Sequence, residues 1–361
     1  MAHSLPSLSR RALLAGAALE AQQTAETVRF DRKIRVGLVG LEGHTGEIIR
    51  PLPRLPEVEV VAISDPDQKA MASAARHPRL KAARQYLDYR QLLDREQLDV
   101  AAICGPNGGR AERILAAIER KIHVVAEKPL AIEMEELDRL EGALRRAGVR
   151  LTMLLPMRFS SPYLAIKLIV DSGEIGEVAQ IAAQKSYKLG QRASWFLRRA
   201  TYGGTIPWIG IHMVDLMRWT SGREMVEAVS YQTRFAVPDL GDMENVTATL
   251  FLLDNGGAGV LRLDYLRPQT APTHGDDRLR LAGSKGVVEY QAATGVTVIS
   301  ETSKPRVIEK LPPEQSLFID FLESVYHGKR PALSLADILR VNRIVLLARQ
   351  SAEEHRIVKL S

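Results

Sequence analysis

The sequence predicts an α/β protein in which a doubly wound parallel sheet is followed by a second domain of strands joined by tight turns. Up to about residue 156, short apolar runs rich in β-branched residues alternate with helix-patterned segments, as in parallel sheets covered by helices on both faces. Farther along, longer strand-like runs are separated by glycine or Asn-Gly turns. The length of 361 residues favours two domains, because it exceeds one comfortable core.

The first domain is expected to span residues 32–156 and to contain five buried strands. These strands are predicted at residues 34–40, 58–64, 98–107, 121–129 and 149–156. A helical segment, residues 66–77, follows the second of them. Buried strands spaced by helices are typical of a parallel sheet rather than of hairpins.

A glycine-rich turn follows the first strand and indicates a dinucleotide site. The glycines are spaced G-x-x-G-x-x-G, one residue longer than the commonest fingerprint. Such a turn lets the backbone approach a pyrophosphate, whose charge rests on amides of the helix N-terminus. The residues expected to contact the cofactor here are Gly40, Gly43, His44, Thr45 and Gly46. The alternative is a plain glycine-rich turn.

Asp65 closes the second strand and favours NAD over NADP. A carboxylate at this position can accept a hydrogen bond from the ribose 2′-hydroxyl, and it would repel a 2′-phosphate. The order of strand, glycine turn, helix, second strand and Asp65 therefore predicts NAD as the cofactor. The alternative reading of Asp65 is a strand-end cap.

The segment "GGTIPWIGIHMVDLMRW", residues 203–219, contains two proton-carrying groups before its closing arginine, His212 and Asp215. If residues 211–219 form a helix, the two side chains share one face, because they are three residues apart. One interpretation is a buried pair that satisfies itself, since buried polar groups are normally partnered. The other is an active-site wall, in which His212 acts on a ligand.

Composition excludes several functional classes. The apolar content of 45% and the charged content of 25% describe an ordinary globular protein. Basic residues are scattered among almost as many acids, so we expect no nucleic-acid binding. Cys104 is the only cysteine, which excludes an intrachain disulfide and a cysteine-clustered metal site; no metal is predicted.

The first 31 residues resemble an export signal. Arg10 and Arg11 stand directly before a short apolar run, residues 12–19, which is the layout of a twin-arginine signal. The run is too short to span a membrane as a helix, and no other segment could do so. We therefore expect a periplasmic protein, or a cytoplasmic one if the segment is only a flexible basic tail.

Four motifs in a fixed order resemble those of one enzyme family. They are "CGPN" (104–107), "AEKPLA" (126–131), "MRFSSPY" (157–163) and the Gly-Gly…Gly-x-His-x-x-Asp pattern of residues 203–215. The chain from about residue 33 to 361 resembles the glucose–fructose oxidoreductase, inositol dehydrogenase and rhizopine-catabolism (Gfo/Idh/MocA) family. The resemblance implies a Rossmann NAD-binding domain followed by an α/β domain with an open, mostly antiparallel sheet.

The second domain is then expected to span residues 157–333 and to serve substrate binding and homo-oligomerisation through its sheet. Its strands are predicted at residues 178–187, 225–235, 245–266, 278–290 and 296–300. Two helical segments, 314–328 and 336–354, have apolar residues at helical spacing. The segment 334–361 is expected to pack back on the Rossmann domain.

By resemblance, Lys128 and His212 are the catalytic residues. The lysine lies beside the nicotinamide, where its charge orients the substrate and stabilises a developing alkoxide. The histidine takes a hydroxyl proton as hydride leaves the same carbon. Further cofactor contacts are expected from Pro106, Asn107, Glu127 and Lys128. Substrate contacts are expected from Arg158, Trp195, Trp208 and Asp215.

Two positions depart from the family pattern. Trp208 stands where members usually carry an aspartate, and Arg110 replaces a frequent histidine. An indole at 208 could stack on the apolar face of a sugar. The expected function, from the resemblance, is that of an NAD-dependent oxidoreductase acting on a secondary hydroxyl of a sugar, cyclitol or sugar acid. The alternatives are an NAD-dependent glycosidase that oxidises, eliminates and re-reduces, and a non-catalytic protein that binds NAD and a sugar.

Overall fold

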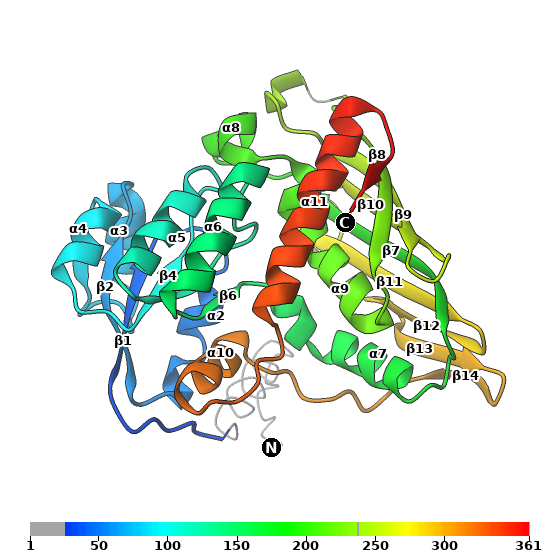
Figure 1. The fold of residues 1–361 in the computed structure, drawn as a ribbon, viewed down its shortest axis with the longest axis horizontal. Helices are drawn as coiled ribbons and strands as arrows, with labels where there is room; N and C mark the ends of the chain where they lie inside the picture. Colours follow the sequence, from blue (N-terminus) through cyan, green and yellow to red (C-terminus); the bar gives the residue numbers. More distant parts are fainter. Residues whose placement is uncertain (1–25, 237, 361) are drawn as a thin grey trace, which may run out of the picture.

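Two β-sheets lie side by side in the computed structural model, which describes residues 26–236 and 238–360 (Figure 1). The first sheet has six parallel strands, and the second has nine strands that are mostly antiparallel. This architecture confirms the predicted fold class. Most of the expected export signal, residues 1–25, lies outside the described part of the chain. No helix in the described ranges is long and apolar enough to cross a membrane.

The first sheet has the strand order of a dinucleotide-binding domain. In spatial order its strands are β3 (Arg84–Tyr86), β2 (Val58–Ser64), β1 (Ile34–Val39), β4 (Val100–Ile103), β5 (His123–Ala126) and β6 (Leu151–Met153). The order reverses between β1 and β4, and ligands of such sheets bind beyond the carboxyl ends of the strands at that point. The short strand β3 escaped prediction because its side chains are polar and largely exposed at the sheet edge.

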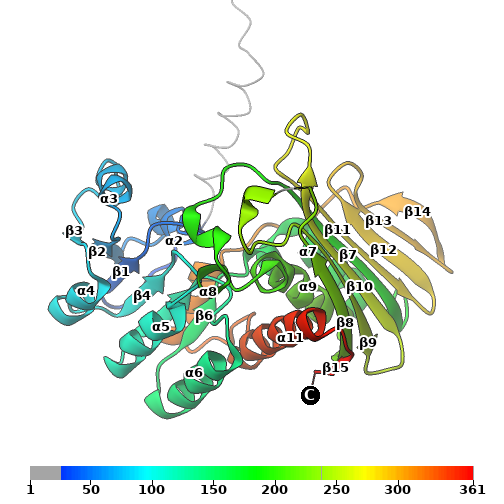
Figure 2. The ribbon, with the colours of Figure 1, turned by 90° about the horizontal axis from the view of Figure 1, so that it is seen from above.

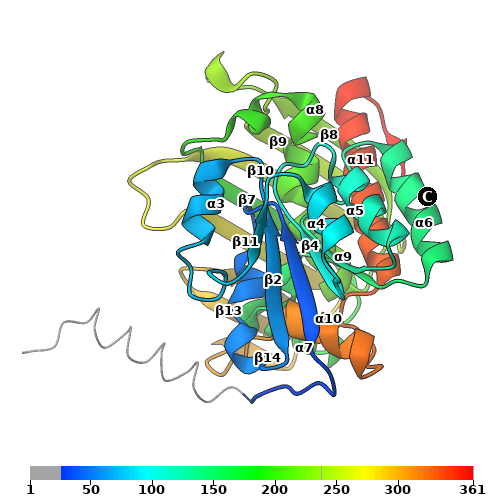
Figure 3. The ribbon, with the colours of Figure 1, turned by 90° about the vertical axis from the view of Figure 1, so that its left-hand side faces the viewer.

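Helices cover both faces of this sheet, which explains its continuous apolar strands. They are α2 (Gly46–Ile49), α3 (Gln68–Ala74), α4 (Tyr89–Arg95), α5 (Arg110–Glu119) and α6 (Met134–Ala147). Seen from the side of this domain, β2 has α3 on one side and α4 and α5 on the other (Figure 3). Helix α6 begins with a capping box, in which the side chains of Glu133 and Glu136 satisfy each other's backbone amides.

The second sheet is built around one central strand, β7. In spatial order its strands are β14 (Ser303–Val307), β13 (Gly295–Ser300), β12 (Gly286–Gln291), β11 (Gly275–Gly283), β7 (Val178–Lys188), β10 (Ala258–Arg267), β9 (Val246–Leu253), β8 (Met225–Thr233) and β15 (Val358–Lys359). Only β7 and β10 pair in parallel. Along β9, buried and exposed residues alternate, because successive side chains point to opposite faces.

Three helices cover the inner face of the second sheet. Helices α7 (Ser161–Asp171), α9 (Ile211–Ser221) and α11 (Leu335–Glu354) lie between the two sheets when the molecule is seen from above (Figure 2). Helix α11 packs on β8 and α9 of the second domain and on α6 and β6 of the first. Helix α11 therefore joins the two domains.

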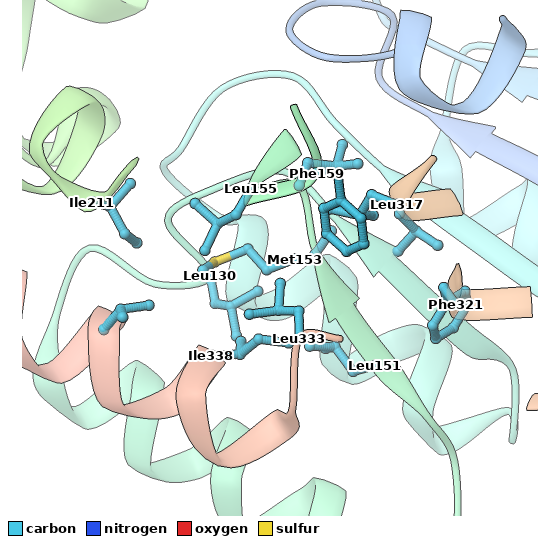
Figure 4. Close-up of a cluster of buried hydrophobic side chains, with 14 of the residues drawn as sticks. Leu130, Leu151, Met153, Leu155, Phe159, Ile211, Leu317, Phe321, Leu333 and Ile338 are labelled. Carbon is cyan, nitrogen blue, oxygen red and sulfur yellow. The ribbon is translucent and has the colours of Figure 1, made fainter. Parts of the chain in front are cut away.

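An apolar cluster joins the two domains (Figure 4). It combines Met153 of β6, Ile211 of α9 and Ile338 of α11, all of which are fully buried. Helix α10 (Leu317–Tyr326) contributes Leu317 and Phe321 to the same cluster. Although the sequence assigns α10 to the second domain, it also packs on α2 of the first.

Candidate active site

The glycine turn after β1 can be formed only by glycines at two of its positions. Gly40 has φ +81°, and a Cβ there would lie 2.6 Å from the carbonyl oxygen of Cys104. Gly43 has φ +89°, and a Cβ there would lie 2.5 Å from Oε2 of Glu127. L-residues rarely adopt this backbone region. The turn is therefore pressed directly against the ends of β4 and β5.

Glu127 fastens the glycine turn to the end of β5. Its carboxylate is fully buried and accepts hydrogen bonds from the amide of His44 at 2.7 Å and from His44 Nδ1 at 2.8 Å. The amide of Lys128 donates to it at 3.0 Å. Burial raises the pKa of Glu127, but the charge and hydrogen bond of His44 outweigh it and lower that pKa to about 2. The carboxylate therefore stays ionised.

The turn leaves backbone donors free for an anion, as NAD binding requires. The amides of Glu42, Gly43, Thr45 and Gly46 donate no hydrogen bond within residues 26–236 and 238–360. Helix α2 has only four residues, because Pro51 and Pro53 provide no amide to continue it. The helix expected to bind the pyrophosphate through its N-terminus is thus short. The backbone amides of the turn itself are the donors that fit a pyrophosphate.

Asp65 supports the same turn from β2. Its Oδ2 accepts the amide of Leu41 at 2.9 Å, and its Oδ1 accepts the amide of Asp67 at 2.8 Å. Each carboxylate oxygen keeps a further acceptor site, so the predicted bond to a ribose hydroxyl stays open to it. Asp65 thus has a structural role at the turn, and its ribose contact stays a prediction.

Asn107 and Arg110 have structural contacts on the other side of the turn. Asn107 Nδ2 donates to the carbonyl of Tyr202 at 2.6 Å, and its Oδ1 accepts from Arg110 at 3.0 Å. Arg110 is fully buried and also donates to the carbonyls of Gly105 and Pro129 at 2.6 Å each. The Asn107 side chain therefore joins the domains, which leaves backbone groups of this segment for the predicted cofactor contact.

Lys128 reaches from the end of β5 to the second domain. Its side chain is 2% exposed. Its Nζ donates to the carbonyl of Trp208 at 2.7 Å and lies 3.2 Å from the centroid of the Trp208 ring. Burial lowers the pKa of Lys128 well below its usual value, although Glu127 opposes the shift. The Lys128 side chain is thus a hydrogen-bond donor that loses its proton more readily than an exposed lysine does.

His212 stands at the second position of α9, directly after a π-helical turn at Ile206–Gly210. Its Nδ1 is buried and has no hydrogen-bond partner among the described residues. Its ring meets that of His44 edge to face at 5.6 Å. Burial, together with the nearby charges of Lys128 and Lys185, lowers its pKa well below 6.5. His212 is therefore neutral at neutral pH and able to accept a proton.

The predicted helix over residues 211–219 is confirmed, but Asp215 does not partner His212. Its oxygens accept hydrogen bonds from Arg158 instead, one of them from Nε at 3.1 Å. Both side chains are at most 2% exposed, and Arg158 also donates to the carbonyl of Ala332 at 3.0 Å. The buried-pair interpretation thus named the wrong partner. Arg158 and Asp215 thus pair with each other in the domain interior, and their expected substrate contacts stay a prediction.

Trp195 and Trp208 lie together beside Lys128, with ring centroids 5.5 Å apart. Trp195 stacks on Phe196 at 3.8 Å, and its Nε1 donates to Glu42 of the glycine turn at 2.7 Å. This bond links the second domain to the cofactor turn. One face of the Trp208 ring is occupied by Lys128, so the indole positions the lysine in addition to its predicted sugar contact.

A second buried lysine, absent from the predicted site residues, faces the same region. Lys185 of β7 is 2% exposed, and its Nζ donates to Asp277 of β11 at 2.7 Å. The remaining Asp277 oxygen and the hydroxyl of Tyr163 are buried without a partner in the described ranges. The signal was present in the strand's period of two, because Ile181, Ala183 and Lys185 all face inward.

The site residues from the two domains together indicate a class of enzyme. A dinucleotide-binding domain contributes the glycine turn and a buried lysine, and a second domain contributes a neutral histidine. The described residues contain no cluster of three or more side chains suited to hold a metal ion. Lys128 as a hydrogen-bond donor, His212 as a proton acceptor and the glycine turn for a dinucleotide together define a two-domain, nucleotide-dependent oxidoreductase.

Comparison with known proteins places the chain in a family. Residues 34–155 match the oxidoreductase family with an NAD-binding Rossmann fold, and residues 163–289 match the GFO/IDH/MocA C-terminal domain. A solved oxidoreductase structure from Thermotoga maritima is 31% identical, with a TM-score of 0.85 over 90% of this chain and 100% of that one. The protein belongs to the Gfo/Idh/MocA family of oxidoreductases, and its cofactor is NAD.

More distant relatives cover nearly the whole chain as well. The uncharacterized oxidoreductase YrbE of Bacillus subtilis is 26% identical over 89% of this chain and 94% of its own. The myo-inositol 2-dehydrogenase of Thermotoga maritima is 24% identical over 91% and 98%, respectively. A levoglucosan dehydrogenase solved with NADH shares the fold at 19% identity, with a TM-score of 0.80 over 91% of this chain and 100% of that one.

Proposed function

We propose that the protein oxidises a secondary hydroxyl group of a sugar, cyclitol or sugar acid. NAD, when bound, accepts the hydride. The observation that carries the proposal is His212, a neutral histidine with an unpartnered buried nitrogen next to Lys128. The names of the inositol and levoglucosan dehydrogenases support a polyhydroxylated substrate.

In this proposal the two residues divide the work on one hydroxyl group. His212 accepts the hydroxyl proton, which a neutral imidazole can do and an imidazolium cannot. Lys128 donates a hydrogen bond to the same oxygen and stabilises the negative charge that develops there. Only one of its three donors is engaged by Trp208, so a donor remains for the substrate.

The test is NADH formation over a panel of sugars, cyclitols and sugar acids. His212→Ala and Lys128→Met should each lower turnover about a hundredfold or more while NAD still binds. Tyr231→Ala is a matched control, because Tyr231 is 63% exposed on β8, away from these residues. If His212→Ala destabilises the fold but leaves activity per folded molecule intact, the proposed role is refuted.

A second candidate is a protein that binds NAD and a sugar without turnover. It is favoured by Trp208, because the indole and its carbonyl hold the Lys128 ammonium where relatives usually provide a carboxylate. Tight NAD binding without NADH formation over the whole panel would support it. Cleavage of a glycoside without net NADH formation would instead indicate the glycosidase alternative.

We also propose that the chain is exported in a folded, NAD-loaded state through Arg10 and Arg11. Twin-arginine transport accepts folded proteins, which suits a protein that must take up its dinucleotide in the cytoplasm. Replacing both arginines with lysine should retain the protein in the cytoplasm. Fractionation of the unaltered protein with the cytoplasm would contradict the proposal.

The outer face of the second sheet is the proposed homo-oligomer contact. Leu250, Leu252 and Val260 on adjacent strands β9 and β10 are 48%, 41% and 38% exposed. Contiguous exposed apolar side chains of this kind mark interaction sites. The double variant Leu250→Glu/Leu252→Glu should sediment as a smaller species, and an unchanged sedimentation coefficient would argue against this face.

A further inference from the structure

Arg192 is an arginine without a counter-ion beside the candidate site. It lies between β7 and the turn at Ser194–Leu197, and no carboxylate forms an ion pair with it in residues 26–236 and 238–360. One Nη donates to the carbonyl of Lys188 at 3.0 Å. Its Nε is buried and has no acceptor among the described residues. An enclosed donor of this kind is costly unless a ligand satisfies it.

Three other partly or fully buried arginines of the same domain are paired with carboxylates. Arg158 bonds to Asp215, Arg199 to Glu244, and Arg218 to Glu224. Arg192 has no such carboxylate partner among the described residues, and it lies in the region where the substrate is proposed to bind.

Two aromatic rings contact the Arg192 guanidinium. Its Cζ lies 4.5 Å from the ring centroid of Tyr265 and 5.3 Å from that of Phe196. Phe196 meets Trp208 edge to face at 5.6 Å, and Trp208 carries the Lys128 ammonium. The charge of Arg192 contributes to lowering the pKa of Lys128, after burial and larger effects from other charges. Phe196 and Trp208 thus connect Arg192 to Lys128 through a chain of contacts.

The carboxylates nearest to this region have other partners. Lys128, Lys185 and Arg192 contribute cations, and Asp277 is the carboxylate paired with Lys185. Glu127 is bound under the glycine turn by His44, and Trp208 provides no charge. An anionic group on the substrate would give Arg192 the partner it lacks.

We propose that the substrate is a sugar acid whose carboxylate is bound by Arg192. This inference rests on the proposed oxidation of a secondary hydroxyl and selects one substrate class for it. The planar guanidinium matches a carboxylate with two parallel hydrogen bonds. The free Asp277 oxygen and the Tyr163 hydroxyl offer an acceptor and a donor to sugar hydroxyls.

The test compares binding of matched ligands to the NAD-loaded protein by calorimetry. The probes are D-glucuronate, D-gluconate, D-glucose and D-glucose 6-phosphate. The unaltered protein should bind at least one acid ten or more times tighter than glucose. Arg192→Gln should abolish that preference and change the affinity for glucose less than threefold, whereas Arg192→Lys should keep part of it. Arg198→Gln is the control, because Arg198 is exposed in the same segment and should leave the preference intact.

Several outcomes would overturn the inference. It fails if no acid binds tighter than glucose, or if Arg192→Gln retains the preference. Tighter binding of glucose 6-phosphate than of either acid would assign the site to phosphate and refute the carboxylate. Arg192-dependent binding of an acid without NADH formation would support this site and contradict the proposed oxidation. NADH formation from glucose, without a preference for an acid, would support the oxidation and contradict the Arg192 site.

Discussion

Glu127→Gln should destabilise the protein by an amount that depends on pH. The folded-state pKa of about 2, against an ordinary value of 4.5, corresponds to roughly 3 kcal/mol of stability at neutral pH, at about 1.4 kcal/mol for each pKa unit. Solvent does not screen the charge of Glu127, because the side chain is fully buried. The amide side chain of the variant keeps an acceptor for the backbone N–H of His44 but lacks the charge.

The sign of the pH dependence follows from the depressed pKa. The carboxylate contributes its full stability above pH 4.5 and loses it as the pH falls toward 2, because the unfolded chain takes up the proton first. By pH 3 about 2 kcal/mol of the contribution should be gone. The difference between the unaltered protein and Glu127→Gln should therefore shrink from about 3 kcal/mol at pH 7 to about 1 kcal/mol at pH 3.

Urea unfolding at pH 7, 5 and 3 measures this difference. Glu119→Gln is the matched control, since Glu119 is exposed on α5 and makes no side-chain hydrogen bond in the described ranges. It should be within about 0.5 kcal/mol of the unaltered protein at each pH. A loss below about 1 kcal/mol for Glu127→Gln at pH 7, or a loss that does not change by pH 3, would refute the role of the His44 contact.

Three further predictions concern residues whose roles the structure refines. Arg158→Met should cost about 3–5 kcal/mol by leaving Asp215 charged and buried, and adding Asp215→Leu should recover most of it; equal urea midpoints for the single and double variants would contradict this. Trp195→Phe should release NAD about fivefold faster in stopped flow, because it removes a bond to Glu42 worth about 1 kcal/mol, and an unchanged rate would show that the bond does not restrain the cofactor. Asp65→Asn keeps the acceptor for Leu41 but should narrow the preference for NAD over NADP; equal affinity of the unaltered protein for both cofactors would remove Asp65 as the ribose ligand.

The sequence by itself determined the architecture. Strand periodicity, helix spacing and the glycine turn are local properties, because burial and backbone conformation leave a repeating pattern in neighbouring residues. The order of motifs also predicted Lys128 and His212 as site residues, and the structure places Lys128 against Trp208 and His212 against His44. These predictions needed no knowledge of which distant segments meet.

Only the tertiary structure decided the partners of the polar groups. Asp215 accepts a hydrogen bond from Arg158, which is 57 positions away, and not from His212 on its own helix. In the sequence, Lys185 has no feature that sets it apart from other strand residues. Its pairing with Asp277 depends on the neighbouring strand β11. Arg192 stands out only once every neighbouring carboxylate has been assigned elsewhere. The physical reason is that a buried charge is stabilised by whatever packing places within a few ångströms of it, and no local pattern encodes that distance.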